Sequence, residues 1–250
     1  MDPQTPVLLV SARMPILSAL LRSDSIEPTI SVAGVTLVAD VAGALYEPES
    51  GALIVADLHL EKGSSFARRG QFLPPYDTAT TLGRLARLIE TYRPRVVIAL
   101  GDSFHDRAAP SRLSEADRVS LAALQNGRDW IWIAGNHDPE PPAGCGGEAV
   151  AEMRLGALTL RHEPSANGHG ELAGHLHPVA AIAIRGRRLR KRCFAADGAR
   201  IVLPAFGAYA GGLNVRDAAF ADLFQRDAMT AWMLGEEGVY AIPASGLRPD

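Results

Sequence analysis

The chain has 250 residues, and its 25 Lys and Arg residues against 28 Asp and Glu residues leave a net charge of −3. A hydrophobic fraction of 47% supports a folded core and excludes disorder, and the charge balance alone indicates neither a nucleic-acid nor a membrane partner. Cys145 and Cys193 are too few for a disulfide framework and favour a reducing compartment. The apolar stretch 6–21 is interrupted by Arg13 and Pro15, so we expect a cytoplasmic protein without a membrane span or secretory signal.

The first 28 residues are rich in proline and have little periodicity, so we expect them to form an N-terminal arm whose role the sequence does not indicate. Residues 29–250 are interpreted as a single domain. Apolar runs ending in turn or polar residues predict strands, and apolar residues at helical spacing predict helices. The expected strands are 30–38, with a turn at Gly34, then 53–56, 96–100 and 130–134; the expected helices are 77–92, capped by Asp77, and 114–125.

This alternation of strand, polar loop and helix predicts an α/β fold with parallel strands. Such folds place their chemistry in the loops beyond the carboxyl ends of the strands. After Glu148 the pattern changes to short strands with few helices, expected at 157–161, 179–184, 201–203 and 239–242. The second half therefore predicts a more antiparallel sheet that packs on the first.

Five polar segments follow or interrupt these apolar runs, and they contain five of the seven histidines. In an extended segment residues i and i+2 share a face, so Asp57 and His59 can bind one ion. Oxygen and imidazole donors without thiolate suit Mn²⁺, Fe²⁺ or Zn²⁺, and the carboxylate of Asp102 can bridge two ions. Each segment alone is equally typical of a turn, but together they favour a metal site. The segments are Asp57-Leu58-His59, Gly101-Asp102, Gly135-Asn136-His137-Asp138, His162 and Gly174-His175-Leu176-His177.

The order D-x-H, G-D, G-N-H-(D/E), H, G-H-x-H over residues 57–177 resembles the calcineurin-like metallophosphoesterase superfamily. The resemblance implies a four-layer α-β-β-α sandwich, in which two mixed sheets are flanked by helices. It also implies two divalent metal ions and hydrolysis of a phosphoester without a covalent protein intermediate. His162 fills the position of the lone histidine better than His169, because His162 ends a strand-like run and His169 lies in a glycine-rich loop.

The same resemblance assigns roles to individual side chains. His137 would be a histidine that binds no metal and protonates the leaving oxygen, and Asp138 would orient the site. One ion would be held by Asp57, His59, Asp102 and His177, and the other by Asp102, Asn136, His162 and His175.

Segments 44–48, 55–63 and 203–214 narrow the resemblance to the bacterial ligase-associated DNA-damage-response phosphoesterases, the PdeM family. This implies phosphodiesterase or endonuclease activity on DNA, with manganese as the metal and zinc or iron as alternatives. It also implies a place in DNA repair beside a ligase, an exonuclease and a helicase. Two other functions stay open: a phosphodiesterase or phosphomonoesterase for small nucleotides, and an inactive scaffold that binds repair partners.

Several basic residues are candidates for contact with substrate. The segment 185–192 holds six basic residues in eight, which fits either phosphate contact, through Arg187, Arg188 and Arg190, or a solvated hairpin edge. Arg68 and Arg69 could guide a polyanion to the metals or could be a surface pair. His105 could line the cleft or pair with Asp106.

Overall fold

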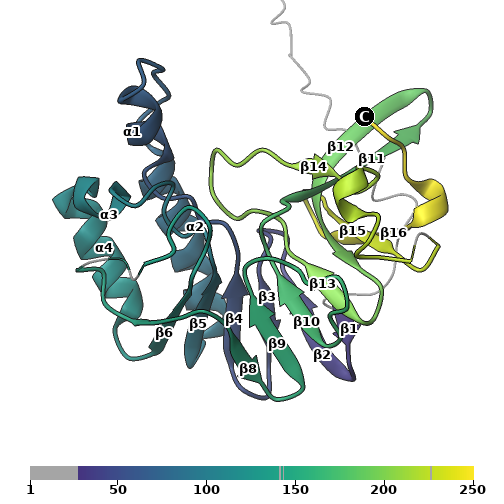
Figure 1. The fold of residues 1–250 in the computed structure, drawn as a ribbon, viewed down its shortest axis with the longest axis horizontal. Coiled ribbons are helices and arrows are strands. Elements are labelled where there is room, and N and C mark those ends of the chain that lie inside the picture. The colour runs from purple at the N-terminus through teal and green to yellow at the C-terminus, as the bar shows by residue number, and fades with distance from the viewer. Residues whose placement is uncertain (1–27, 141, 143, 226) are drawn as a thin grey trace, which may run out of the picture.

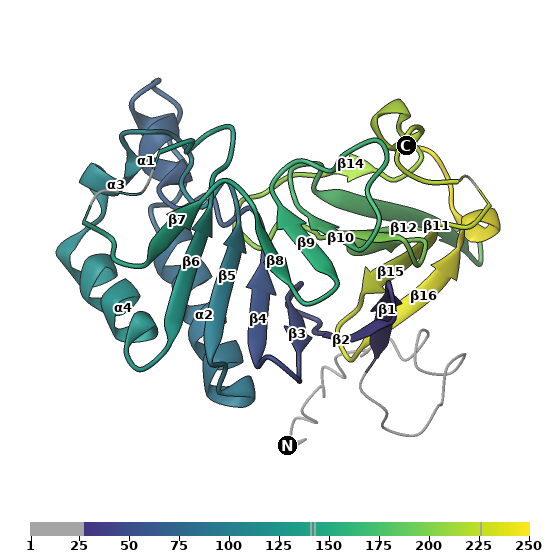
Figure 2. The same cartoon turned by 60° about the horizontal axis from the view of Figure 1, so that its bottom comes forward.

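Two mixed β-sheets face each other in the computed structural model, and α-helices cover the outer face of the first sheet (Figures 1 and 2). The structure describes residues 28–140, 142, 144–225 and 227–250. The arm expected over residues 1–28 lies outside the described residues, apart from Pro28.

The first sheet has seven strands in chain order, from β1 to β7. The first four pair antiparallel, and β4 to β7 pair parallel, as the alternation of strands and helices predicts. The strands are β1 (Thr29–Val32), β2 (Val35–Ala39), β3 (Leu45–Glu47), β4 (Ala52–Val55), β5 (Val96–Leu100), β6 (Asp129–Ile133) and β7 (Glu148–Val150).

The central strands of this sheet are buried on both faces because their side chains are apolar at every position. On β4, Leu53 and Val55 pack against the helices, whereas Ala52 and Ile54 pack against the second sheet. The helices are α1 (Lys62–Ala67), α2 (Asp77–Tyr92), α3 (Ala109–Arg112) and α4 (Glu115–Gln125).

Both long helices match the expected ranges, but their N-termini differ. The hydroxyl of Ser114 accepts a hydrogen bond from the backbone N–H of Asp117 and caps α4 at 3.1 Å. Asp77 does not cap α2, since its carboxylate instead accepts the backbone N–H of Gly63 at 3.0 Å. The competing donor comes from α1, which no local sequence pattern reveals.

The second sheet combines parallel and antiparallel pairs in the order β14-β11-β12-β13-β10-β9-β8, with β15 and β16 joined through β12. Five of its strands, β8, β10, β12, β14 and β15, are absent from the strands expected from the sequence. Its strands are β8 (Met153–Leu155), β9 (Leu158–Arg161), β10 (Glu171–Ala173), β11 (Pro178–Ile184), β12 (Arg187–Ala196), β13 (Arg200–Val202), β14 (Leu213–Asn214), β15 (Thr230–Leu234) and β16 (Val239–Pro243).

Three separate apolar cores hold the layers together and confirm the predicted sandwich. One lies between α2 and α4 and the first sheet, one between the two sheets, and one on the outer face of the second sheet. Among the described residues this last face is covered by loops and two short 3₁₀ helices rather than by α-helices. These are η1 (Ala218–Phe220) and η2 (Ala244–Gly246).

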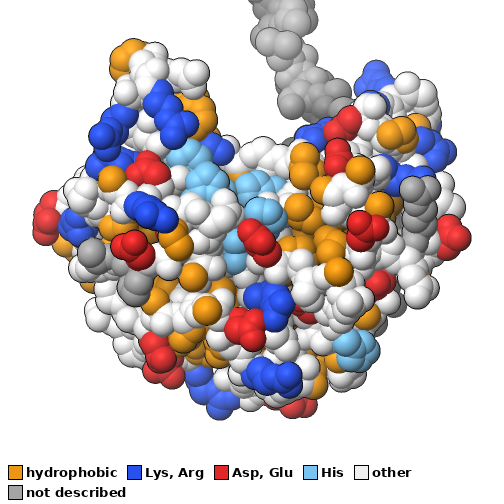
Figure 3. Space-filling model, viewed as in Figure 1, with side chains coloured by type: hydrophobic (Ala, Val, Ile, Leu, Met, Phe, Trp, Pro, Cys, Tyr) orange, Lys and Arg blue, Asp and Glu red, His pale blue; other side chains and the backbone are white. Residues whose placement is uncertain are grey.

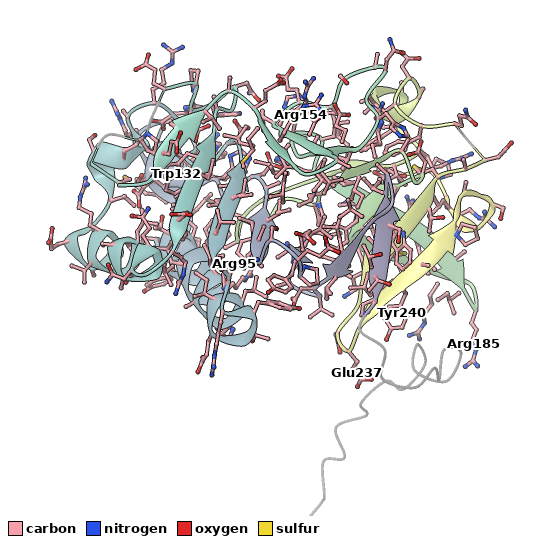
Figure 4. The ribbon with its side chains drawn as sticks, turned by 90° about the horizontal axis from the view of Figure 1, so that it is seen from below. Arg95, Trp132, Arg154, Arg185, Glu237 and Tyr240 are labelled. Atoms are coloured by element: carbon pink, nitrogen blue, oxygen red, sulfur yellow. The ribbon has the colours of Figure 1, made fainter. Side chains whose placement is uncertain are left out.

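A long hairpin of β11 and β12 projects from the second sheet (Figure 1). Arg185 and Gly186 form its two-residue turn, and both have the positive φ, 50° and 75°, that such tight turns favour. Arg185 lies at the opposite side of the molecule from Trp132 of β6 (Figure 4). The basic segment of the sequence therefore occupies the hairpin, at a distance from the helices.

The described helices include none with the length and apolar character needed to cross a bilayer. Cys145 and Cys193 are both buried, and neither forms a disulfide.

Phe194 tests the core between the sheets, since its ring is completely buried there. Phe194→Ala should lower the free energy of unfolding by about 3–5 kcal/mol through lost burial and the cavity left behind. Val119→Ala on α4, whose side chain is 60% exposed, is the control and should shift it by less than about 0.5 kcal/mol. Urea unfolding followed by circular dichroism measures both, and equal small shifts would contradict this account of the core.

Candidate metal centre

The predicted site residues converge at one edge of the sandwich. Asp57, Asp102 and Asn136 follow β4, β5 and β6, whose carboxyl ends meet because the strands are parallel. The second sheet adds His162 after β9 and His175 after β10, which are also paired in parallel. The space-filling view shows histidine side chains on the floor of a hollow between two projections (Figure 3).

One group of donor atoms forms around Asp57, which is completely buried. His59 and His177 face each other, with their Nε2 atoms 3.2 Å apart. The Nε2 of His177 lies 3.3 Å from Oδ1 of Asp57, and the backbone N–H of His175 donates to Oδ2 at 3.0 Å. One atom each from Asp57, His59 and His177 could share one metal ion.

A second group forms beside it around His162. The Nε2 of His162 lies 2.8 Å from Oδ1 of Asn136 and 3.4 Å from Oδ1 of Asp102. The Nδ1 of His175 lies 3.0 Å from the same Asn136 oxygen and 3.3 Å from the His162 nitrogen. Asp57, Asp102 and His162 also offer donors close enough for one ion. The structure thus brings all seven predicted ligands together.

The chemistry of these donors fits a cation. The Nδ1 of His162 lies 2.9 Å from the carbonyl oxygen of Leu100, which can only accept, so this nitrogen carries a proton. In the neutral ring, Nε2 then presents a lone pair to the oxygens of Asn136 and Asp102. Ligands roughly 2.1 Å from one ion, at tetrahedral to octahedral angles, lie about 3.0–3.4 Å apart. Most of the observed separations fall in or near this range.

His59 is suited to bind metal as a neutral imidazole. Burial lowers its pKa to about 2, and the positive charges of His177 and Lys62 act in the same direction. A metal-bound histidine must offer a free lone pair, so a ring that resists protonation is ready for that role at neutral pH.

The backbone at these positions is strained. Among non-glycine residues, a positive φ is uncommon and costs free energy unless the surroundings enforce it. The expectation that Asp57 and His59 lie in an extended segment was therefore wrong. Both residues have left-handed backbone conformations, and the chain bends there. The predicted ligands concerned are Asp57, His59, Asp102, His175 and His177, with φ between 43° and 69°.

His137 lies beside the donor groups, and its ring does not join either of them. Its backbone N–H donates to Oδ1 of Asp102 at 2.9 Å, and its Nδ1 lies 2.9 Å from the carbonyl oxygen of His105. The opposite nitrogen, Nε2, lies 3.9 Å from Oδ2 of Asp102, and the side chain is 41% exposed. The ring is therefore oriented by the main chain and open to the cleft.

His105 lines the cleft rather than pairing with Asp106. Its ring stacks on His137, with centroids 5.2 Å apart, and meets His59 edge-on at 5.4 Å. Burial, with Lys62 and His137, lowers its pKa to about 4. The Asp106 carboxylate instead pairs with Arg112 at 2.7 Å. The carbonyl of His105 is a site feature that sequence reasoning missed, because any residue type could supply it.

Asp138 joins the loop after β5 to the loop after β6. Its Oδ2 accepts the backbone N–H of Phe104 at 3.0 Å, while its Oδ1 is buried without a hydrogen-bond partner among the described residues. Burial raises the pKa of Asp138 to about 7, and the nearby Asp102 charge also raises it. This geometry agrees with a positioning role.

Lys62 is a second feature that the sequence analysis did not single out as a site residue. Its ammonium lies 5.9 Å from the centroid of the Phe66 ring, and no carboxylate of the described residues lies within ion-pair distance. Burial lowers its pKa, and its charge acts on both His59 and His105. The sequence did offer a signal for this role, because Lys62 follows the predicted ligand His59 by only three positions.

The candidate substrate arginines lie on the two projections beside the hollow. Arg68 and Arg69 are exposed directly after α1. Arg187, Arg188 and Arg190 are exposed on β12, where the Asp250 carboxylate accepts from Arg188 at 2.9 Å and from Arg190 at 3.1 Å. His169 is exposed in its loop, as expected. None of these arginines contributes to the donor groups.

Comparison with known proteins agrees with this architecture. A family model described as "Calcineurin-like phosphoesterase" matches residues 52–188, more than half of the chain. The chain belongs to the calcineurin-like phosphoesterase family. It is therefore a metal-dependent hydrolase that acts on phosphoesters. No curated protein matches the chain.

Two solved structures are similar to this phosphoesterase. The nuclease MPE of Pseudomonas putida is 32% identical, with a TM-score of 0.66, and the match covers 86% of this chain and 99% of that one. A predicted phosphoesterase from Streptococcus pneumoniae TIGR4 is 13% identical with a TM-score of 0.30, and the match covers 77% of this chain and 96% of that one.

Gly101 tests how tightly this phosphoesterase packs its donors. A Cβ there would lie 2.5 Å from the ring of His162, and the φ of Gly101 is +75°. Gly101→Ala should displace His162 and greatly reduce both bound metal and activity, measured by elemental analysis and phosphodiester turnover.

Gly127→Ala is the matched control, because Gly127 has the same φ of +75° with nothing within 4 Å of an added Cβ. Both variants carry the conformational cost of alanine at positive φ, about 1 kcal/mol. Only Gly101→Ala should lose metal. Equal metal content in the two variants would contradict the packing described.

Proposed function

We propose that this phosphoesterase is a nuclease that hydrolyses phosphodiester bonds of DNA with two divalent metal ions. The observation that carries the proposal is the convergence of seven donor side chains into two adjacent groups at the floor of a hollow (Figure 3). The 32% identity to a Pseudomonas putida nuclease over 86% of the chain supports a nucleic acid as the polymer cleaved, and the resemblance to DNA-damage-response phosphoesterases favours DNA.

The two donor groups would divide the ions between them. Asp57, His59 and His177 would hold one, and Asn136, His162 and His175 the other, with the Asp102 carboxylate between them. Bound there, two divalent ions would acidify a water molecule and neutralise charge at the phosphate. A donor set of oxygen and imidazole without thiolate suits manganese, our proposed metal, as well as iron or zinc.

His137 would supply the proton that the leaving oxygen needs. The hydrogen bond from its Nδ1 to the His105 carbonyl leaves Nε2 facing the cleft. Histidine ionises near neutral pH and can both hold and release a proton there. Lys62, which lacks a carboxylate partner among the described residues, would hold a non-bridging phosphate oxygen.

The β11–β12 hairpin would contact DNA phosphates away from the cleavage point. Arg190, Lys191 and Arg192 line one cavity of about 410 Å³ beside the Ala210, Gly211 and Gly212 backbone. In the structure, the Asp250 carboxylate neutralises part of the positive charge of the hairpin by pairing with Arg188 and Arg190. A phosphate would compete with that carboxylate for the same guanidinium groups.

The resemblance to ligase-associated DNA-damage-response phosphoesterases extends the proposal to DNA repair, alongside a ligase, a helicase and an exonuclease. Action on cellular DNA would place the protein in the cytoplasm, where cysteines outside disulfides, such as Cys145 and Cys193, are usual.

Cleavage of circular single-stranded DNA tests the proposal, because a circle has no ends and only internal cutting opens it. The chelated protein should be inactive, and added Mn²⁺ should restore cutting better than Mg²⁺ or Zn²⁺. Chromogenic mono- and diesters are the controls. Turnover of these small esters with intact circular DNA would instead assign a small-molecule phosphoesterase.

His137→Ala should reduce DNA cutting at least about a hundredfold, the usual size of a general acid's contribution. Metal content should stay near that of the unaltered protein, because His137 belongs to neither donor group. Elemental analysis and single-turnover cleavage measure the two quantities. Full activity would refute the role of His137.

Asp250→Asn tests the hairpin, because the neutral amide releases Arg188 and Arg190. The variant should bind DNA more tightly at low salt, by about twofold to tenfold, while its turnover of a small diester is unchanged. The triple change of Arg187, Arg188 and Arg190 to Ala should weaken DNA binding. Unchanged DNA affinity in both variants would leave the hairpin as a solvated edge.

A further inference from the structure

The loop that connects α1 to α2, residues 68–76, exposes two large aromatic side chains. Phe72 is 86% exposed and Tyr76 is 66% exposed, the highest values among the large hydrophobic side chains of the described residues. Single exposed hydrophobic residues are common on protein surfaces. Two aromatic rings within five positions, beside the basic pair Arg68 and Arg69, call for a ligand that combines flat apolar groups with negative charge.

This 68–76 loop is held in shape by its own hydrogen bonds. The backbone N–H groups of Gly70 and Gln71 donate to the carbonyls of Ala67 and Phe66, both at 3.0 Å. The hydroxyl of Tyr209 donates to the carbonyl of Pro74 at 2.9 Å and joins the loop to the segment after β13. The rings are thus displayed on a preformed support, which lowers the entropy cost of binding.

The base of the 68–76 loop adjoins the metal centre. The Phe66 ring lies 5.6 Å from the ring of His105, which stacks on His137. In the space-filling view, hydrophobic and basic side chains gather on this projection beside the histidines (Figure 3).

The charges of the loop have no counterpart in the protein itself. Among the residues that the structure describes, no carboxylate lies within ion-pair distance of Arg68 or Arg69. A guanidinium in that state is free to bind phosphate in a bidentate manner. Arg68 and Arg69 begin the loop and Phe72 and Tyr76 follow within seven positions, so an occupant should carry both anionic and flat apolar groups.

We propose that the 68–76 loop is a base-stacking platform, where unpaired bases of the polynucleotide flanking the cleaved bond stack on Phe72 and Tyr76. Arg68 and Arg69 hold phosphates of the same strand. Every base has a flat π face, so such stacking tolerates any sequence. This inference rests on the proposed nuclease function and adds the group of the substrate that the loop recognises.

The test compares an oligo(dT) strand with a strand of the same length made of abasic sugar phosphates, which keeps the charge and removes the bases. The double variant Phe72→Ala/Tyr76→Ala should bind oligo(dT) about tenfold to a hundredfold more weakly. Its affinity for the abasic strand should not change. Fluorescence anisotropy of labelled strands, with Ca²⁺ in place of the catalytic metal, gives both dissociation constants.

Three controls make the result specific. Val119→Ala removes an exposed side chain from α4 and should alter neither affinity. Phe72→Trp/Tyr76→Trp keeps aromatic faces and should restore oligo(dT) binding. Turnover of a chromogenic diester should be the same in all variants, because the two rings contribute no donor to the metal centre.

Equal weakening on both strands, or no weakening on either, would overturn the stacking platform. So would an effect of the double variant on binding to lipid vesicles or on self-association, since the loop would then serve a membrane or a protein. If the unaltered protein opens circular DNA but binds both strands equally, only this inference fails. If it neither cuts nor binds DNA, the proposed function fails with it.

Discussion

The structure depends on a group of lone pairs that face one another. The imidazole nitrogens and the carboxylate and amide oxygens at the edge of the sandwich lie mostly 2.8–3.4 Å apart, so polar atoms from both sheets meet in one small volume. Bringing buried polar groups together costs free energy unless each finds a partner. The three apolar cores supply the stability that offsets this cost.

The unfavourable backbone conformations of the predicted ligands are a local consequence of holding these side chains together. Among the described residues, nine other than glycine have a positive φ, and five of these are predicted ligands, placed where the chain leaves a buried strand and must turn at once. Close glycine contacts complete this geometry. A Cβ on Gly174 would lie 2.6 Å from Oδ2 of Asp57, so no other residue fits without moving that carboxylate. Stability gained in the cores offsets conformations that are unfavourable on their own.

Local periodicity predicted the long apolar strands of the first sheet, which have clear ends, and its helices, which have one apolar face. It missed the three-residue strands β3 and β7 there and the short strands β8, β10 and β14 of the second sheet. It also missed β12, where six basic residues within positions 185–192 hide the apolar end that reaches Phe194, and it missed β15. The metal motif could be assembled from spacing and resemblance. Contacts made by the backbone, or by side chains distant in sequence, could not be predicted in this way. Examples are the His105 carbonyl at His137, the Gly63 N–H at Asp77 and the Asp250 carboxylate at Arg188.

The arrangement of charge explains how a chain with a net charge of −3 can serve a polyanionic substrate. Screening in salt limits the reach of surface charges to roughly 10 Å, so the local field at the cleft matters more than the total. Acidic residues are spread over the molecule, whereas Arg68 and Arg69 on one wall and Arg187 on the other lack a carboxylate within ion-pair distance among the described residues. Burial lowers the pKa of His59, so that ring adds no positive charge at neutral pH. In the proposed function, a strand drawn in by these arginines would meet the ammonium of Lys62 near the centre, and bound metal ions would add the larger part of the positive charge there, so productive binding would strengthen with metal loading.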